Sequence, residues 1–373
     1  MATPQFRIWF GERAASVDEL RRIEQIQVTQ EMDAFWEAQL RLVLCLDASG
    51  AWQHWPGDSA APFSRVRVEL DIGDGRFQPL IDGPLVSIDA ELDAQPGRST
   101  ATLLVRDDSA FLHIDEAVEA PFEHRSDSAI AEELFGRFPQ IQSQRIAGTS
   151  LTPETTTRRG TVLQFLRELA GANDRHAYVL PGGTPGASIG CFLPDPGDAV
   201  TLPPLVLIGA QRNLANASIT QDPDGGERTQ AQLLSTDDQG VVSTETGSDQ
   251  LGLIGALPAR PADLTPRRLL HPSDNTRADP AAAAAAQARR RSRVYQLRCQ
   301  VLPGCYAAVL TPYQKVRVDA GAMPYSGDYL ITKVVHHISP SLYTQDLEAR
   351  SDSASVVSAN GPAALASAAQ GIF

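Results

Sequence analysis

The stretch MPYSGDYLITKVVHHISPSLYTQDLEARSDS, residues 323–353, carries the clearest pattern in the chain. From Asp328 to His336 the residues form two alternating sets, and β-branched residues in both sets favour a strand with two faces. Ser-Pro-Ser at residues 339–341 interrupts this strand, and residues 343–350 resume the pattern in the return direction. The stretch is therefore predicted to be a β-hairpin.

A similar pattern occurs near the start of the chain, at residues 83–109. A gapless alignment that places Gly83 opposite Gly327 gives seven identities in 27 positions, where about two are expected by chance. We interpret the match as one β unit used twice, with the two glycines at turns. The identical pairs are Gly83/Gly327, Pro96/Pro340, Thr100/Thr344, Leu103/Leu347, Arg106/Arg350, Asp108/Asp352 and Ser109/Ser353.

The composition is that of a soluble globular protein with two or three domains. The chain has 373 residues, of which 42% are hydrophobic and 21% are charged. Its net charge of −13 argues against direct nucleic-acid recognition, which requires clustered Lys and Arg. The basic run at residues 289–293 lies in an Ala-rich stretch and is interpreted as a solvated helix face.

The sequence also predicts where the protein is made. Residues 1–10 lack the pattern of a signal sequence, and no apolar stretch has the length of a membrane span. We therefore expect cytoplasmic assembly without membrane insertion. Four cysteines in so long a chain do not form a disulfide framework.

Residues 1–108 are predicted to be a first β domain. Alternation is clear at residues 6–10, 38–46 and 66–72, and the Gly-Asp-Gly turn at residues 73–75 is a hairpin signal. At least five strands joined by short turns favour a small barrel or a strongly curled sheet.

Residues 109–203 are predicted to be an α+β middle domain. Helices are expected at residues 126–138 and 161–170, the second beginning with a capping box formed by Thr161 and Gln164. Strands are expected at residues 176–180 and 189–192.

The rest of the chain is predicted to hold a second β domain made of residues 204–221 and 294–352. Its expected strands include residues 294–301, 306–310 and 315–318, followed by the hairpin quoted above. Residues 222–293 form an insertion and connector, with a helix-prone segment at residues 280–291. Residues 353–373 are predicted to be a flexible tail.

No catalytic, cofactor or metal site emerges from the sequence. His336 and His337 are adjacent in a predicted strand, so their side chains point to opposite faces and do not share one metal ion. The spacing of Cys299 and Cys305 matches no zinc pattern. The acidic pair Glu132-Glu133 fits a solvated helix face, and no nucleophile-elbow motif is present.

The order of these motifs resembles the baseplate hub family of contractile injection systems. This family includes the phage late control protein D, the phage tail hub and the amino-terminal part of type VI secretion spike proteins. The resemblance is carried by Gln30–Ala34 leading into 38–46, Leu80-x-x-Gly83-x-x-Val86, Arg106-Asp107-Asp108, Ser126–Ala131, Thr161–Ala170, Tyr178-Val179, Ser326–His336 and Tyr343–Arg350.

The resemblance implies two related tube-forming β-barrel domains in each chain. Three chains would then form a homotrimeric ring with pseudo-sixfold symmetry, joining a sixfold inner tube to a threefold central spike and forming part of a cargo channel. Gly83, Arg106, Gly327 and Arg350 would be structural markers of the repeated unit. The expected partners are an inner tube protein, other baseplate proteins and a separate spike protein, since no spike repeats are found up to Phe373.

Two other functions remain open from the sequence. One is a cell-wall hydrolase on the baseplate, whose acidic residues would be Glu132 and Glu133. The other is a carbohydrate-binding β module for host attachment, for which the scattered residues Trp9, Trp36, Trp52 and Trp55 are the only support.

Overall fold

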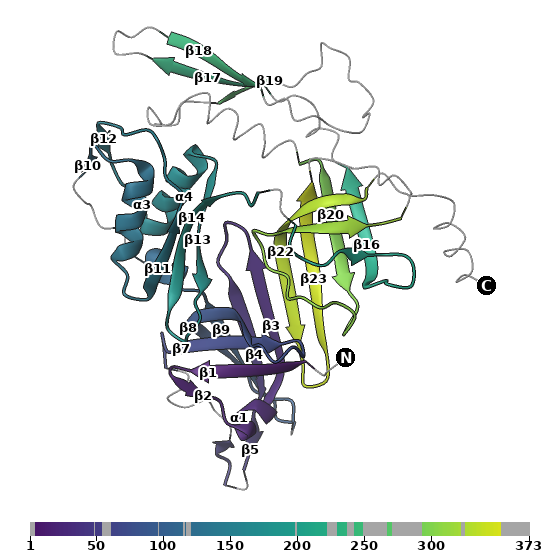
Figure 1. Ribbon diagram of the computed structural model, residues 1–373. Helices are drawn as coiled ribbons and strands as arrows, with labels where there is room; N and C mark the ends of the chain where they lie inside the picture. Colours follow the sequence, from purple (N-terminus) through teal and green to yellow (C-terminus); the bar gives the residue numbers. More distant parts are fainter. Residues whose placement is uncertain are drawn as a thin grey trace.

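The computed structural model is mainly β, as predicted (Figure 1). Helices α3 (Asp127–Gly136) and α4 (Val162–Ala172) lie together on one side of the molecule, whereas the short α1 (Val17–Arg21) lies at its lower end beside β5 (Cys45–Leu46). The structure describes residues 4–47, 49–53, 61–95, 97–114, 116, 121–197, 200–221, 230–236, 242–248, 267–270, 293–321 and 325–351.

The first part of the chain forms a β unit around one hydrophobic core. Ile8, Leu40 and Leu103 are buried in this core, and the last two come from strands in which buried residues alternate with more exposed ones. The elements are β1 (Gln5–Phe10), β2 (Arg13–Ala14), α1 (Val17–Arg21), β3 (Ile23–Glu31), β4 (Glu37–Val43), β5 (Cys45–Leu46), β6 (Trp52–Gln53), β7 (Arg65–Asp71), β8 (Gln78–Glu91) and β9 (Thr100–Arg106).

The next part combines helices with a small sheet. α3 and α4 pack against the sheet β11-β14-β13, and Phe135, Phe165 and Phe192 are buried between them (Figure 1). The predicted capping box of Thr161 and Gln164 is confirmed at the start of α4. The elements are α2 (Ser109–Leu112), β10 (Phe122–Glu123), α3 (Asp127–Gly136), β11 (Ile141–Ile146), β12 (Thr155–Thr156), α4 (Val162–Ala172), β13 (Arg175–Pro181) and β14 (Ser188–Pro194).

The last part returns to β structure, with a core of its own around Leu297, Val316 and Ile331. The quoted stretch is the predicted hairpin, formed by β22 and β23. The elements are β15 (Leu205–Val206), β16 (Leu214–Gln221), β17 (Gln230–Thr236), β18 (Val242–Ser248), β19 (Arg267–Leu270), β20 (Tyr295–Val301), β21 (Lys315–Asp319), β22 (Gly327–Ile338) and β23 (Tyr343–Ser351).

Two predictions in this part have a different outcome. The expected strand at residues 306–310 is wrong, because the amide of Leu310 donates to the side-chain oxygen of Gln345 instead of to a neighbouring strand. The helix expected at residues 280–291 and the tail at residues 353–373 lie outside the described residues.

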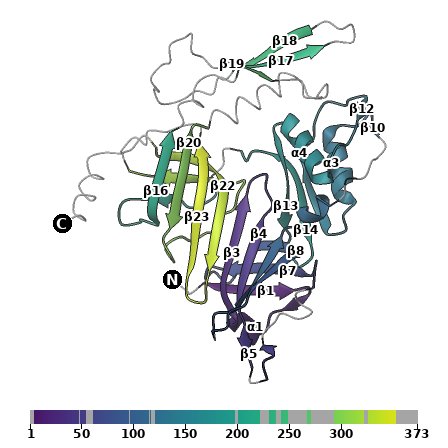
Figure 2. The same ribbon diagram turned by 180° about the vertical axis from the view of Figure 1, so that it is seen from behind.

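One continuous sheet replaces the two closed barrels that were predicted. Its strands follow the order β16-β20-β23-β22-β3-β4-β9-β8-β7-β1-β2, with β21 also paired to β22 and β15 to β21. β22 joins the two halves because residues 333–338 pair antiparallel with residues 26–31 of β3. Figures 1 and 2 show β22 beside β3 from both sides. The barrel prediction failed because strand β22 uses its second edge for this connection instead of closing its own half.

The two halves of the sheet repeat the same strand order. The first half runs β3-β4-β9-β8-β7-β1, and the second runs β16-β20-β23-β22-β21-β15, so corresponding strands also follow the same order along the chain. We call these the first and second β unit. They differ at one end, where β1 pairs antiparallel with β7 but β15 pairs parallel with β21.

The pairing register also repeats. Ile88 pairs with Leu103 in the first unit and Val334 pairs with Leu347 in the second. Both hairpins carry a register shift at the same place, between Leu85 and Ser87 and between Ile331 and Lys333. Arg106 and Arg350 are therefore equivalent, as the gapless alignment predicted. On the other strand of the hairpin that alignment is two residues out, and Gly83 corresponds to Tyr329 instead of Gly327.

Neither glycine lies in the predicted turn: Gly83 is inside β8 and Gly327 begins β22. A Cβ atom at residue 83 would lie 1.9 Å from the carbonyl oxygen of Arg106. This close approach between two backbones requires a residue without a side chain.

We expect Gly83→Ala to lower the free energy of unfolding by about 1–3 kcal/mol, because strands β8 and β9 must move apart. Urea denaturation measures the loss. Gly148→Ala is the matched control, since a Cβ there meets no atom within 4 Å. Equal denaturation midpoints for the two variants would show that the close approach carries no strain.

Candidate functional site

The large sheet has one polar face that crosses both β units. Along each strand the buried residues point to the hydrophobic cores and the alternate residues point the other way. The pairing register places these alternate residues side by side across β3, β4, β9, β20, β22 and β23. We call this surface the polar face; it includes Gln27, Thr29, Glu31, Glu37, Gln39, Arg41, Thr102, Arg106, Gln296, Arg298, Gln300, Lys333, His337, Thr344, Asp346, Glu348 and Arg350.

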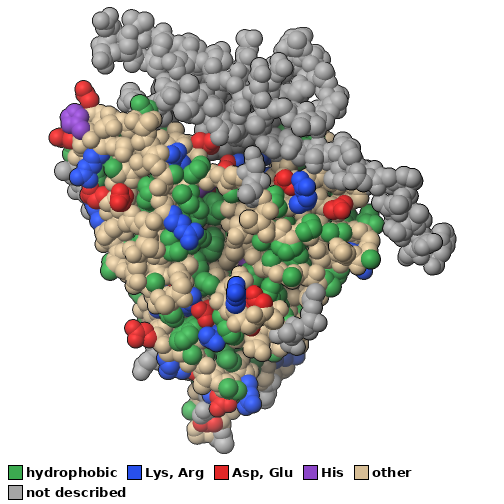
Figure 3. Space-filling view, in the orientation of Figure 1, with side chains coloured by type: hydrophobic (Ala, Val, Ile, Leu, Met, Phe, Trp, Pro, Cys, Tyr) green, Lys and Arg blue, Asp and Glu red, His purple; other side chains and the backbone are tan. Residues whose placement is uncertain are grey.

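Charges on the polar face are balanced by cross-strand ion pairs. Half-exposed pairs of this kind contribute little stability, but they prevent a field of one sign. Acidic and basic side chains are also intermixed over the side of the molecule drawn in Figure 3. The ion pairs are Arg41–Glu24 at 3.1 Å, Arg106–Glu37 at 2.8 Å, Lys333–Glu31 at 2.8 Å and Arg298–Glu348 at 3.5 Å, and the His337 ring lies in hydrogen-bonding contact with Asp346 at 3.1 Å.

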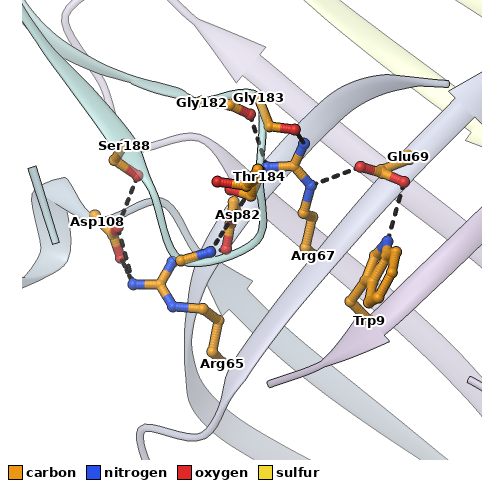
Figure 4. Close-up of polar contacts among 11 residues, drawn as sticks. Trp9, Arg65, Arg67, Glu69, Asp82, Asp108, Gly182, Gly183, Thr184 and Ser188 are labelled. Carbon is orange, nitrogen blue, oxygen red and sulfur yellow. Dashed lines mark hydrogen bonds and ion pairs between the residues drawn. The ribbon is translucent and has the colours of Figure 1, made fainter. Parts of the chain in front are cut away.

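A buried arginine fixes the helical part of the molecule to the first β unit (Figure 4). The side chain of Arg67, on β7, is only 1% exposed. Its guanidinium donates to Glu69 at 2.8 Å, to Asp82 at 3.0 Å and to the carbonyl oxygens of Gly182 at 2.8 Å and Thr184 at 3.2 Å. One guanidinium group therefore binds acceptors on two strands, β7 and β8, and in the loop between β13 and β14.

Arg65, two residues earlier, extends this cluster. It donates to Asp82 at 2.7 Å and to Asp108 at 2.9 Å, and Asp108 also accepts from the Ser188 hydroxyl at 2.7 Å (Figure 4). Burial raises the pKa of Asp108, and Arg65 and Ser188 act in the opposite direction by stabilising the carboxylate. Ser188 begins β14, so this contact is a second connection to the helical part.

The second β unit contains an ion pair equivalent to Arg67–Asp82, which was not predicted from the sequence. Arg317 donates to Asp328 at 2.8 Å, and the shared register makes these residues equivalent to Arg67 and Asp82. The signal was present in the sequence as Val-Arg-Val at residues 66–68 and again at residues 316–318. The Arg317 side chain is 57% exposed, whereas its counterpart in the first unit is buried.

This difference gives a matched experiment. Arg67→Met leaves buried carboxylates and carbonyl groups without their donor, so we expect a loss of about 3–5 kcal/mol in the free energy of unfolding. Arg317→Met removes the equivalent exposed pair and is expected to cost at most about 1 kcal/mol. Chemical denaturation of both variants measures the contrast, and equal losses would contradict the structural role assigned to Arg67.

A second polar cluster joins three parts of the chain around His176. Its ring nitrogens lie 2.9 Å from Asp33, after β3, and 3.1 Å from Asp195, after β14. Arg293, just before β20, forms an ion pair with Asp195. Tyr313 meets the His176 ring edge-on, with 5.5 Å between ring centroids.

The two carboxylates set the charge of this histidine. Burial lowers the pKa of His176, but hydrogen bonds and charge interactions with Asp195 and Asp33 outweigh it and raise the pKa to about 9. In the same cluster, His176 and Arg293 overcome the effect of burial and lower the pKa of Asp195 to about 2. His176 is therefore protonated at neutral pH and acts as a cationic connector.

Protonated His176 should stabilise the fold below its ordinary pKa of 6.5, and this stabilisation should disappear as the pH rises through about 9. We expect the stability lost in His176→Gln to be about 1–3 kcal/mol greater at pH 6 than at pH 10. Denaturation at the two pH values measures it. Burial lowers the pKa of His336 to about 3, so the stability lost in His336→Gln should be the same at pH 7 and pH 10. If the losses in the two variants changed with pH to a similar extent, His176 would not be the protonated connector.

The predicted marker residues do not form one site. Arg106 pairs with Glu37 on the polar face and lies over the Phe35 ring, 4.9 Å from its centroid. Arg350 is exposed on the same face, opposite Gln296. Gly83 and Gly327 are buried in strands of different units. These positions therefore belong to the sheet and its packing.

The histidine pair is separated as its strand position predicts. His336 is buried and bonds the Tyr343 hydroxyl at 2.9 Å and Gln30 at 3.3 Å. His337 points to the polar face and meets Asp346 at 3.1 Å. Within the described residues, no three His, Cys, Asp or Glu side chains gather as a metal site requires.

The residues of the two alternative functions do not assemble either. Arg137 and Arg125 lower the pKa of Glu133, whereas a general acid needs a raised pKa. Trp36 is buried in the first core, and the Trp9 indole donates to Glu69 at 3.0 Å. Trp52 is 37% exposed on β6, and Trp55 lies outside the described residues.

None of the helices in the described part of the chain is long and apolar enough to cross a membrane. Cys45, Cys191, Cys299 and Cys305 are all free, and the first and last of them are exposed.

The fold is that of phage tail proteins. A tail protein from Neisseria meningitidis MC58 aligns with a TM-score of 0.66 and 14% identity, covering 94% of this chain and 97% of that one. The 43 kDa tail protein of prophage MuSo2 from Shewanella oneidensis aligns with a TM-score of 0.65 and 13% identity, covering 93% and 98%.

A chain of the Francisella PdpA-VgrG complex is also similar. Its TM-score is 0.56 at 9% identity, and the match covers 94% of this chain and 58% of that one. These likenesses confirm, at the level of the fold, the resemblance to phage tail and type VI secretion spike proteins. No protein-family model and no curated protein sequence matches the chain.

Proposed function

We propose that this protein is the structural baseplate hub of a contractile, phage tail-like injection particle. In this role three chains form a ring that joins the sixfold inner tube to a threefold central spike. The observation that carries the proposal is the repeated β unit, whose strand order and register recur within one chain. Two equivalent units in each of three chains present six similar surfaces to a sixfold partner.

The polar face is suited to line part of the cargo channel. It spans both units without interruption, and most of its charged side chains form ion pairs, so it would not retain cargo of either sign strongly. We assign the two tube domains to residues 1–108 and to residues 204–221 with 294–352. Residues 109–203 are the middle domain, held by Arg67 and His176 at the sites described above.

The role is mechanical, and we propose no enzymatic activity or cofactor. The spike, the inner tube protein and the other baseplate proteins are separate partners. Assembly takes place in the cytoplasm, after which the hub is part of the particle. The similarity of its fold to tail proteins supports its place in a tail-like particle.

Light scattering of the purified protein, alone and with its spike protein, tests the proposal. We expect a mass of three chains, near three times 40.1 kDa, in at least the spike complex. Incubation with peptidoglycan is expected to release no soluble fragments. A strict monomer in both samples, or release of fragments, would overturn the proposal.

A further inference from the structure

Several edges of the large sheet, including those of β2 and β15, are unpaired in the part of the chain that the structure describes, and two of them bear on the internal repeat. The first is the outer edge of β16, whose paired neighbour is β20 alone. The second is on β8, where residues 87–91 pair with β9 on one side and with no described strand on the other. We call these the β16 edge and the β8 edge. Open edges of this kind are templates for pairing with another chain.

The internal repeat shows what pairs with each edge. β16 is equivalent to β3 and β8 is equivalent to β22, and β3 and β22 pair with each other inside the chain. Thus the two open edges are the counterparts of the two strands that join the units. We propose that the β16 edge of one copy of this chain pairs antiparallel with the β8 edge of a second copy, repeating the junction between β3 and β22.

The internal junction also fixes the register of the proposed one. The shared register shifts make Ile23 and Gln25 of β3 equivalent to Leu214 and Asn216 of β16. Transferring the β3·β22 pairs onto the two edges gives Ile88/Gln221, Asp89/Thr220, Ala90/Ile219, Glu91/Ser218 and Leu92/Ala217. On the core side Ala90 then meets Ile219 and Leu92 meets Ala217, while Ile88 lies opposite Gln221. On the polar side Asp89 and Glu91 meet hydroxyl groups.

The exposure of apolar residues at the two edges supports a second copy of the chain as their partner. Leu92 is 59% exposed, whereas its equivalent, Ile338, is 2% exposed inside the internal junction. Ala217 and Ile219 are half-exposed, whereas their equivalents Ile26 and Val28 are fully buried. The internal junction between β3 and β22 thus buries side chains whose counterparts at the two open edges remain in contact with water.

An aromatic residue beside the β8 edge gives an independent indication. The amide of Phe63 donates to Leu85 at 3.0 Å, just as the amide of Tyr313 donates to Ile331 at 3.2 Å. Both aromatic residues have a φ of 62°, which is unusual for residues other than glycine.

The two aromatic side chains differ in their surroundings. The Tyr313 hydroxyl accepts from the Asp33 amide at 2.8 Å, just beyond β3 at the internal junction, and its ring stacks on Tyr178 at 3.7 Å. The equivalent Phe63 side chain is 60% exposed. A second copy on the β8 edge would cover it.

Disulfide cross-linking tests the register. In a background in which the exposed Cys45 and Cys305 are replaced by Ser, Glu91→Cys is combined with Ser218→Cys. Directly opposed residues have Cα atoms about 4.5–5.5 Å apart, which suits a disulfide. We expect oxidation to give products of two and three chains and none larger. The control, Glu91→Cys with Ile219→Cys, places the thiols on opposite faces and should not cross-link.

This inference rests on the proposed ring, and the outcomes separate the two. If the protein has the mass of three chains but the Glu91/Ser218 disulfide does not form, or the control pair cross-links equally well, the strand register is wrong and the proposed ring still stands. Products that stop at a number other than three would support the strand pairing and overturn the trimer. Cross-linking of the Glu91/Ser218 pair that stops at three chains supports both.

A substitution without cysteine gives a second readout. Ala90 is exposed in the single chain, so Ala90→Lys should fold normally, with unchanged circular dichroism. It would bring a charge into the buried side of the proposed interface and should weaken self-association at least ~10-fold. Val17→Lys, at a side chain 63% exposed on α1, is the matched control. Unchanged association of Ala90→Lys, measured by analytical ultracentrifugation, would contradict the interface.

Discussion

The antiparallel junction between β3 and β22 is the constraint on which the rest of the structure depends. It joins residues 26–31 to residues 333–338, so the chain must complete almost its whole length before this pairing forms. Without it, the sheet would separate into two units, each with an additional open edge. With it, both polar surfaces become one face, and the two cores lie on the same side of a continuous sheet.

The repeated unit has kept its backbone pairing while its side chains have taken different roles. The Arg67–Asp82 pair is buried and fixes the loop between β13 and β14, whereas the equivalent Arg317–Asp328 pair is partly exposed. An ion pair of the same chemistry therefore has a large structural effect in one unit and a small one in the other, because burial removes the competing water. The helical part consequently attaches to the first unit through a contact that the second cannot reproduce.

Features set by residues close in sequence could be predicted, whereas contacts between residues far apart in the sequence could not. The hairpin at residues 327–351 and the capping box of Thr161 were predicted because alternation and capping depend on residues close in sequence. The repeat was detected through Arg106 and Arg350, but the alignment could not locate a two-residue difference within the hairpin. The cluster around His176 was missed because Asp33, Asp195 and Arg293 come from distant parts of the chain.

By itself, the sequence determined the mainly β character, the faces of the strands and the presence of a repeated unit. These follow from side-chain polarity at a spacing of two residues and from turn chemistry, both of which are local. Only the tertiary structure decided that the halves form one open sheet instead of two barrels. Strand edges offer the same amide and carbonyl groups whatever the sequence, so the choice between closing on itself and joining a neighbour depends on how the whole chain packs.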